Sequence, residues 1–191
     1  DRFLECDDVE QVKETEGYEG LFHLIEQTPV IYLKAFGPIC EVGAESYSFL
    51  KPGKNIEEKG DYLFHELTGN CVGVHVRRTD HTDAIANSPL ALFAGRMKKE
   101  LEADKETSFF VATDDKEVRR ELKELLPDAK LIFPQSDVID RDSKEGIEEA
   151  FVEMIALSKC RKILGSYNST FSLLPSYIGN IPLETVRRKK S

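Results

Sequence analysis

Charged and hydroxyl-bearing side chains follow three apolar segments of this sequence at the points where those segments end. The first cluster is Arg77-Arg78-Thr79-Asp80, the second is Thr113-Asp114-Asp115, and the third consists of Ser166, Asn168, Ser169 and Thr170. Two adjacent guanidinium groups bind planar or multiply charged anions well, because several N–H donors act together. We therefore predict an anion site at these residues, with diphosphate as the first candidate.

The apolar segments that precede these clusters have the composition of buried strands. They are short and rich in β-branched or aromatic residues, which favours strands covered on both faces. Further segments of the same kind occur before and after them. The predicted strands are, in chain order, 30–33, 71–76, 108–112, 130–133, 162–165 and 181–185.

Apolar residues at helical spacing separate these strands. The predicted helices lie within 18–26, 90–101, 118–125 and 147–157, with a short last helix that ends at Ile178. The sequence Asn87-Ser88-Pro89 is typical of an N-cap followed by proline at the first helical position. From residue 71 onward, strands that alternate with helices predict an α/β fold with a Rossmann-like, doubly wound parallel sheet. Because parallel strands end at one edge of the sheet, where such folds bind ligands, the three polar clusters should meet there.

The composition is that of an ordinary globular protein, and it narrows the classes of partner. Of the 191 residues, 40% are hydrophobic and 32% charged, and the formal net charge is −9. An acidic chain is a poor general binder of nucleic acid or anionic membranes. No apolar run approaches the roughly 20 residues of a membrane-spanning helix. The four cysteines lack metal-binding spacing, so we expect reduced thiols in a cytoplasmic protein, with peripheral membrane association left open.

Each polar cluster also has a purely structural explanation. Asp114 or Asp115 can cap the helix that follows it, and Ser169 or Thr170 can cap the next one. An N-cap serine also directs main-chain N–H groups toward an anion. Capping and anion binding are therefore both open at these positions.

Arg77 and His75 have competing interpretations in the same way. Arg77 is predicted to hold diphosphate, or to form a salt bridge with Asp80, Asp114 or Asp115, and the two roles are compatible. His75 lies two residues earlier on the same strand face. It is either a buried histidine with satisfied hydrogen bonds or a contact to a base or a ribose.

The same residues resemble the conserved motifs of a known enzyme family. Residues 72–80, Val-Gly-Val-His-Val-Arg-Arg-Thr-Asp, closely resemble the first motif of the GDP-fucose-dependent α1,6-fucosyltransferases, the core- and Nod-factor-fucosyltransferase group. The wider fucosyltransferase superfamily shares the His-x-Arg core. Residues 110–115 resemble the second motif, and residues 157–172 contain the third. The resemblance covers residues 70–185.

This resemblance implies a GT-B glycosyltransferase, in which residues 70–191 form the Rossmann-like domain that binds the nucleotide sugar. Residues 1–69 would be an amino-terminal lead-in or a remnant of the acceptor-side domain. The implied reaction is transfer of fucose from GDP-fucose to a hydroxyl of a glycan acceptor. It would proceed with inversion at the anomeric carbon and without a metal ion or other cofactor.

The resemblance also implies roles for individual residues. Arg77 would hold the β-phosphate and offset the charge on the departing GDP, while Arg78 would support it or touch the donor. His75 would contact the nucleoside, and Glu153 would either accept hydrogen bonds from guanine or be a solvent-facing helix residue. The other implied donor-binding residues are Asp80, Asp114, Asp115, Ser169, Thr170, Phe171 and Ser172.

One departure from the family pattern bears on the catalytic base. Ile85 stands where the α1,6 enzymes carry a glutamate proposed as the catalytic base. His81 and Asp83 are near it in the sequence and are candidate bases, since a base needs only reach and a suitable pKa. The alternative functions are a nucleotide-sugar-binding module without transferase activity, or a glycosyltransferase that uses a different nucleotide sugar.

An acidic loop contains a possible metal signature. Asp140-Arg141-Asp142 matches the short Asp-x-Asp pattern with which some glycosyltransferases hold a metal ion. The loop from 135 to 145 is polar throughout, and charge runs of this kind are usually solvated surface. We therefore predict no metal site.

Overall fold

A computed structural model describes residues 2–35, 39–40, 42–47, 49, 51–67, 69–136 and 142–188. The chain divides into two compact units, Asp1–Ser46 and Tyr47–Ser191, and each is described by itself. Residues 47–69, which the sequence analysis grouped with the amino-terminal part, therefore belong to the larger unit by their contacts. A 3-10 turn, η1 (Ala44–Tyr47), spans the division.

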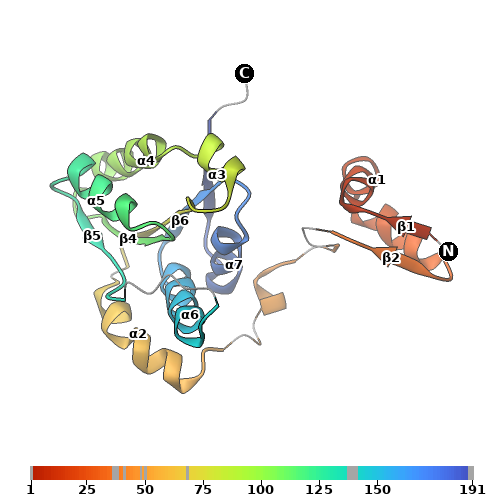
Figure 1. The fold of residues 1–191 in the computed structure, drawn as a ribbon, viewed down its shortest axis with the longest axis horizontal. Coiled ribbons are helices and arrows are strands. Elements are labelled where there is room, and N and C mark those ends of the chain that lie inside the picture. The colour runs from red at the N-terminus through yellow and green to blue at the C-terminus, as the bar shows by residue number, and fades with distance from the viewer. Residues whose placement is uncertain are drawn as a thin grey trace. The chain divides into compact units, whose positions relative to one another are not determined.

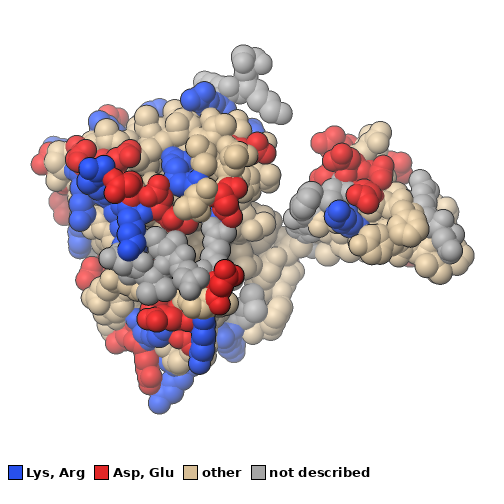
Figure 2. Space-filling model, in the orientation of Figure 1, with Lys and Arg blue, Asp and Glu red and all other residues tan. Residues whose placement is uncertain are grey.

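The smaller unit consists of two strands and one helix (Figure 1). Strand β1 (Arg2–Leu4) pairs in parallel with β2 (Ile31–Leu33), and α1 (Cys6–Glu26) connects them. Leu4, Val9 and Leu21 form its buried centre. Helix α1 is interrupted at Gly17, whose φ of 70° is not helical. The predicted segment 18–26 is the part after this break, and the part before it begins at Cys6, where Glu5 and Asp8 form a capping box. Figure 2 shows acidic side chains gathered on this unit.

The larger unit is a five-stranded parallel sheet with helices on both faces (Figure 1). The strand order is β5-β4-β3-β6-β7, so β3, which carries the paired arginines at its end, is central. The strands are β3 (Cys71–Val76), β4 (Ser108–Thr113), β5 (Lys130–Ile132), β6 (Lys162–Ser166) and β7 (Leu183–Val186). The helices are α2 (Lys54–Glu66), α3 (Thr82–Asn87), α4 (Leu90–Ala103), α5 (Lys116–Leu125), α6 (Lys144–Ser158) and α7 (Thr170–Gly179).

Alternate residues of the central strands fill two separate cores. Val72, Val74 and Val76 face α4 and α5, whereas Phe110 and Ala112 face α2 and α6. All residues of β3 and β4 are buried, as expected for parallel strands covered on both sides. The predicted doubly wound α/β fold is thus confirmed.

Two features near the end of β3 differ from the sequence-based expectation. Residues 82–87 form α3, a short helix that the apolar pattern did not indicate. Pro89 occupies the N-cap position of α4, and the helix begins at Leu90 rather than at the proline. Ser88 is instead fully buried, donates to the Val186 carbonyl and accepts the N–H of Tyr167. Ser88, a residue type common at helix caps, therefore connects the end of α3 to the ends of β6 and β7 through its hydroxyl.

Among the described residues, no helix combines the length and the apolar character needed to cross a bilayer.

Candidate functional site

The carboxylate of Asp114, at the end of β4, organises the loop that follows β3. Its Oδ1 accepts the main-chain N–H of Arg78 at 2.7 Å, and its Oδ2 accepts the Thr79 N–H at 3.2 Å and the Thr79 hydroxyl at 2.8 Å. The side chain is only 8% exposed. A carboxylate that accepts several N–H and O–H bonds holds its donors strongly, because each bond is charge-assisted. Asp114 is thus placed to hold the arginine loop.

Arg77 lies at the same edge, between two carboxylates. Its guanidinium pairs with Asp80 and, at 3.1 Å, with Asp114, and its side chain is 19% exposed. Arg77 therefore forms salt bridges with two of the three carboxylates that the sequence offered. A guanidinium has five N–H donors in a fixed plane, so holding a carboxylate and recognising an anion remain compatible.

Arg78 turns away from its neighbour and bonds to the main chain. It donates to the carbonyl of Arg77 and to that of Ser88, both at 3.0 Å. Burial lowers the pKa of its guanidinium. Of the two roles open to Arg78, the geometry favours support of the loop.

The end of β6 meets this loop from the other side. The Ser166 hydroxyl accepts the main-chain N–H of Arg77 at 2.9 Å and donates to the His75 carbonyl at 3.1 Å. Asn168 then turns the chain in the left-handed region, with φ of 51°, and Ser169 stands at the N-cap of α7. The Ser169 side chain makes no capping bond, but its carbonyl accepts the N–H of Ser172 at 3.0 Å. The third polar cluster therefore joins the first.

His75 and Ser172 form a buried pair beneath this edge. The Nδ1 of His75 lies 2.7 Å from the Ser172 hydroxyl, and the imidazole lies 4.8 Å from the ring of Phe171. Burial lowers the pKa of His75 to about 4, helped by the charge of Arg77 and opposed by that of Asp114. The imidazole is neutral at physiological pH as a result.

Asp115 has the capping role that the sequence left open. It is the N-cap of α5, and its carboxylate accepts the Glu117 N–H at 2.9 Å. Thr113 packs against it, with its hydroxyl accepting the Asp115 N–H at 3.2 Å. These bonds position the carboxylate at the end of β4, beside Asp114.

The two candidate bases lie on or before α3. His81 caps this helix through Nδ1, which accepts the Ala84 N–H at 3.1 Å, while its Nε2 lies 3.0 Å from the Asn168 carbonyl. Both ring nitrogens thus bond to the main chain. Asp83 is exposed in the first turn of α3, and Ile85 is 41% exposed next to it.

Glu153 lies on α6 in a strongly perturbed environment. Burial raises the pKa of its carboxyl to about 8, with Arg119 opposing the shift and Glu149 and Asp114 adding to it. Among the described residues, none hydrogen-bonds to this carboxyl. A partly buried acid to which no described residue hydrogen-bonds is a candidate for ligand binding rather than a solvent-facing helix residue.

Sequence reasoning missed several residues that build this edge. Gly165 on β6 lacks the Cβ that would lie 2.5 Å from the Cβ of Ser172, and Arg119 lies 5.9 Å from the ring of Phe133 near Glu153. Ser88 anchors Arg78, as described above. None of these residues carries a local signal, because each acts on a partner far away in the sequence.

In the part of the chain that the structure describes, no group of three or more metal-ligating side chains gathers. Of the predicted acidic signature, Asp140 and Arg141 lie outside the described residues, and Asp142 is exposed.

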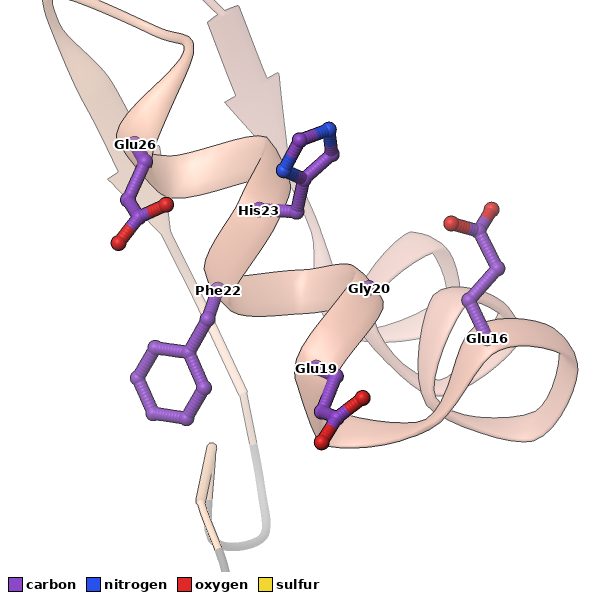
Figure 3. A pocket seen from close by; sticks show the side chains of 6 residues that line it. All are labelled: Glu16, Glu19, Gly20, Phe22, His23 and Glu26. Carbon is purple, nitrogen blue, oxygen red and sulfur yellow. The ribbon is translucent and has the colours of Figure 1, made fainter.

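A hollow on α1 of the smaller unit is lined by acidic side chains and one histidine. Its lining residues are Glu16, Glu19, Gly20, Phe22, His23 and Glu26. Figure 3 shows their side chains pointing apart rather than toward a common centre, and His23 bonds instead to Gln27 at 2.7 Å. None of the predicted site residues lines this hollow.

No protein-family model and no curated protein matches this sequence. Solved structures do match. POFUT1 in complex with GDP aligns with a TM-score of 0.56 and 16% identity over 94% of this chain and 62% of that one. NodZ alpha-1,6-fucosyltransferase soaked with GDP-fucose aligns with a TM-score of 0.56 and 21% identity, over 90% and 59%. Fucosyltransferase NodZ from Bradyrhizobium aligns with a TM-score of 0.53 and 22% identity over 88% of this chain and 58% of that one.

This chain therefore spans between 58% and 62% of the length of these structures. At such low identity the similarity is one of fold, and it agrees with the fold that the motifs implied. The chain has the α/β fold seen in NodZ and POFUT1.

Proposed function

We propose that this chain carries the donor-binding half of a glycosyltransferase that moves fucose from GDP-fucose to a glycan hydroxyl. The observation that carries the proposal is the meeting of three strand ends around Arg77. Its main-chain N–H bonds to Ser166 of β6, its guanidinium pairs with Asp114, the residue after β4, and α7 begins four residues after Ser166. Guanidinium groups and helix N-termini both favour phosphate oxygens.

In this proposal the acceptor oxygen attacks C1 of fucose from the face opposite the diphosphate. The new O–C1 bond forms as the bond from C1 to the phosphate oxygen breaks, so the configuration inverts and the electron pair leaves with GDP. Arg77 and the first-turn N–H groups of α7 stabilise the charge that develops on the β-phosphate. Interactions of this kind are worth about 3–4 kcal/mol for each donor group, and no metal ion takes part.

In this proposal a base on this chain takes the proton of the acceptor hydroxyl. Asp83 is the better of the two candidates, because it is exposed, whereas both ring nitrogens of His81 bond to the main chain. His81 then serves to join α3 to the turn before α7. The smaller unit would belong to the acceptor side of the enzyme.

The guanine base would lie toward α6 and β5. Glu153, as a carboxylate, accepts the N1–H and N2–H donors of guanine through its two oxygens, and the electrostatic influence of Asp114 on Glu153 links this position to the arginine loop. Asp115, which caps α5, lies between the arginine loop and Glu153 in the sequence. It is a candidate to accept hydrogen bonds from the ribose hydroxyls.

The test is calorimetric binding of GDP, GDP-fucose, GDP-mannose and a UDP-sugar, followed by donor hydrolysis and transfer assays. We expect guanosine ligands to bind best. Arg77→Ala should weaken GDP binding by about 3 kcal/mol, roughly 100-fold, because charge-assisted hydrogen bonds are lost. Arg120→Ala is the matched control, since Arg120 is 67% exposed and, among the described residues, pairs with Glu117 one turn away and with no other acidic side chain. Tighter binding of the UDP-sugar, or unchanged binding by Arg77→Ala, contradicts the proposal.

A second function, nucleotide-sugar binding without transfer, is favoured by the surroundings of α3. Ile85 is exposed at the position where the α1,6-fucosyltransferases have a glutamate, and both ring nitrogens of His81 already bond to main-chain atoms. GDP-fucose binding without hydrolysis or transfer to any glycan in an acceptor panel supports this function. Turnover that disappears in Asp83→Asn supports the enzyme.

A further inference from the structure

His75 and Ser172 are 97 positions apart in the sequence and in direct contact in the core. The two polar atoms are 2.7 Å apart, and the residues are 3% and 1% exposed. Burying a polar group without a partner costs free energy, so a buried pair of this kind stays together. The contact fixes the first turn of α7 to the middle of the sheet.

The backbone is arranged to permit this contact. Gly165 pairs with His75 in the sheet register, and a Cβ there would meet the Cβ and Oγ of Ser172 at 2.5 and 2.7 Å. Only a residue without a side chain lets α7 come this close to β6. Phe171 closes the arrangement by packing its ring against the imidazole.

Ser172 itself has almost no surface left for a ligand. At 1% exposure it is badly placed to line a phosphate pocket with its hydroxyl, and its N–H already bonds to the Ser169 carbonyl. The first N–H groups of a helix have no partners within the helix. The contribution of this turn to an anion therefore comes from main-chain N–H groups whose place depends on Ser172.

We propose that His75 is a positioning residue, whose Nδ1 holds Ser172 and through it sets the first turn of α7 at the edge where Arg77 lies. The effect of His75 on affinity for the diphosphate of a nucleotide rests on the proposed function. It differs from a direct contact between His75 and the nucleoside, in which Nε2 would be the atom that matters.

Asparagine and glutamine separate these two roles. The side-chain amide of Asn reaches about as far as Nδ1 of a histidine, whereas that of Gln reaches about as far as Nε2. His75→Asn should therefore keep the bond to Ser172, and His75→Gln should lose it. Ser172→Ala removes the same bond from the other side with a smaller change in volume.

Two readouts are measured on the intact chain: hydrogen exchange of the amides of residues 171–173 without ligand, and GDP affinity by calorimetry. We expect at least tenfold faster exchange and about tenfold weaker GDP binding in His75→Gln and Ser172→Ala. His75→Asn should stay within threefold of the unmodified protein in both. The double variant His75→Gln/Ser172→Ala should lose no more than either single variant, because both remove one interaction.

The opposite pattern overturns the proposal. Retained affinity in His75→Gln with lost affinity in His75→Asn assigns Nε2 to the nucleoside, and unchanged exchange in Ser172→Ala removes the positioning role. If the histidine variants do not fold, Ser172→Ala still decides whether the bond between His75 and Ser172 sets the first turn of α7. If the unmodified protein binds no GDP, the proposed function fails, while the exchange measurements still decide whether His75 sets the first turn of α7.

Discussion

The guanine site proposed around Glu153 makes nucleotide binding depend on pH. Burial raises the pKa of this carboxyl to about 8, so the free protein carries it protonated at neutral pH. Guanine offers two N–H donors, and only the carboxylate accepts both of them. GDP binding must therefore expel a proton from Glu153, and its affinity should rise with pH until the carboxyl ionises by itself.

The magnitude follows from the pKa. A pH of 6 lies about two units below the pKa of this carboxyl, and each pH unit below the pKa adds about 1.4 kcal/mol to the free energy needed to ionise it. The ionisation costs about 2.7 kcal/mol at pH 6 and about 0.4 kcal/mol at pH 8. We expect GDP to bind about 50-fold more tightly at pH 8 than at pH 6 for this reason.

Calorimetry at pH 6, 7 and 8 measures this dependence, and buffers with different ionisation enthalpies report the released proton. The terminal phosphate of GDP also titrates near pH 6, as phosphomonoesters do. Glu153→Gln is therefore the control, because it keeps the contribution of the phosphate and removes that of the carboxyl. Parallel pH profiles for the unmodified protein and Glu153→Gln would refute the reasoning.

The same pKa predicts a stability effect without ligand. A carboxyl whose pKa is higher in the folded protein than its usual 4.5 stabilises the fold fully below that value, and the contribution is lost as pH rises through about 8. In urea unfolding, the free energy of unfolding of Glu153→Gln should rise by about 4 kcal/mol relative to that of the unmodified protein between pH 4 and pH 8. A constant difference over this range contradicts the assignment of the pKa.

Two further predictions concern the positions that build the edge of the sheet. Asp114→Asn should lower the free energy of unfolding by about 1–3 kcal/mol and weaken GDP binding, because main-chain donors of the arginine loop lose a charged acceptor. The control Asp115→Asn keeps a good N-cap and should change the free energy of unfolding little. Equal effects of the two variants in urea unfolding would contradict the role of Asp114. Gly165→Ala should destabilise by about 1–3 kcal/mol, because its Cβ meets Ser172 at 2.5 Å. Gly95→Ala on α4, with nothing within 4 Å of a Cβ, should stabilise by about 1 kcal/mol in the same assay.

Local pattern was sufficient to predict most of the fold. The runs 71–76, 108–112 and 162–165 are apolar and bounded by polar residues, and each forms a parallel strand of the sheet. Strand direction follows from the alternation with helices, so the meeting of the three polar clusters at one edge was also predictable. Helix α3 was not, because residues 82–87 contain only one buried residue, Ala84, and no periodic stripe.

Only the tertiary structure decided what each polar residue does at that edge. Asp114 and Asp115 are adjacent and chemically identical, yet one accepts bonds from the arginine loop and the other caps α5. Arg78 bonds to the Ser88 carbonyl, which no spacing indicates. The physical reason is that strand and helix patterns are local, whereas hydrogen bonds and desolvation depend on groups that approach across the sheet, such as Ser172 from 97 positions away.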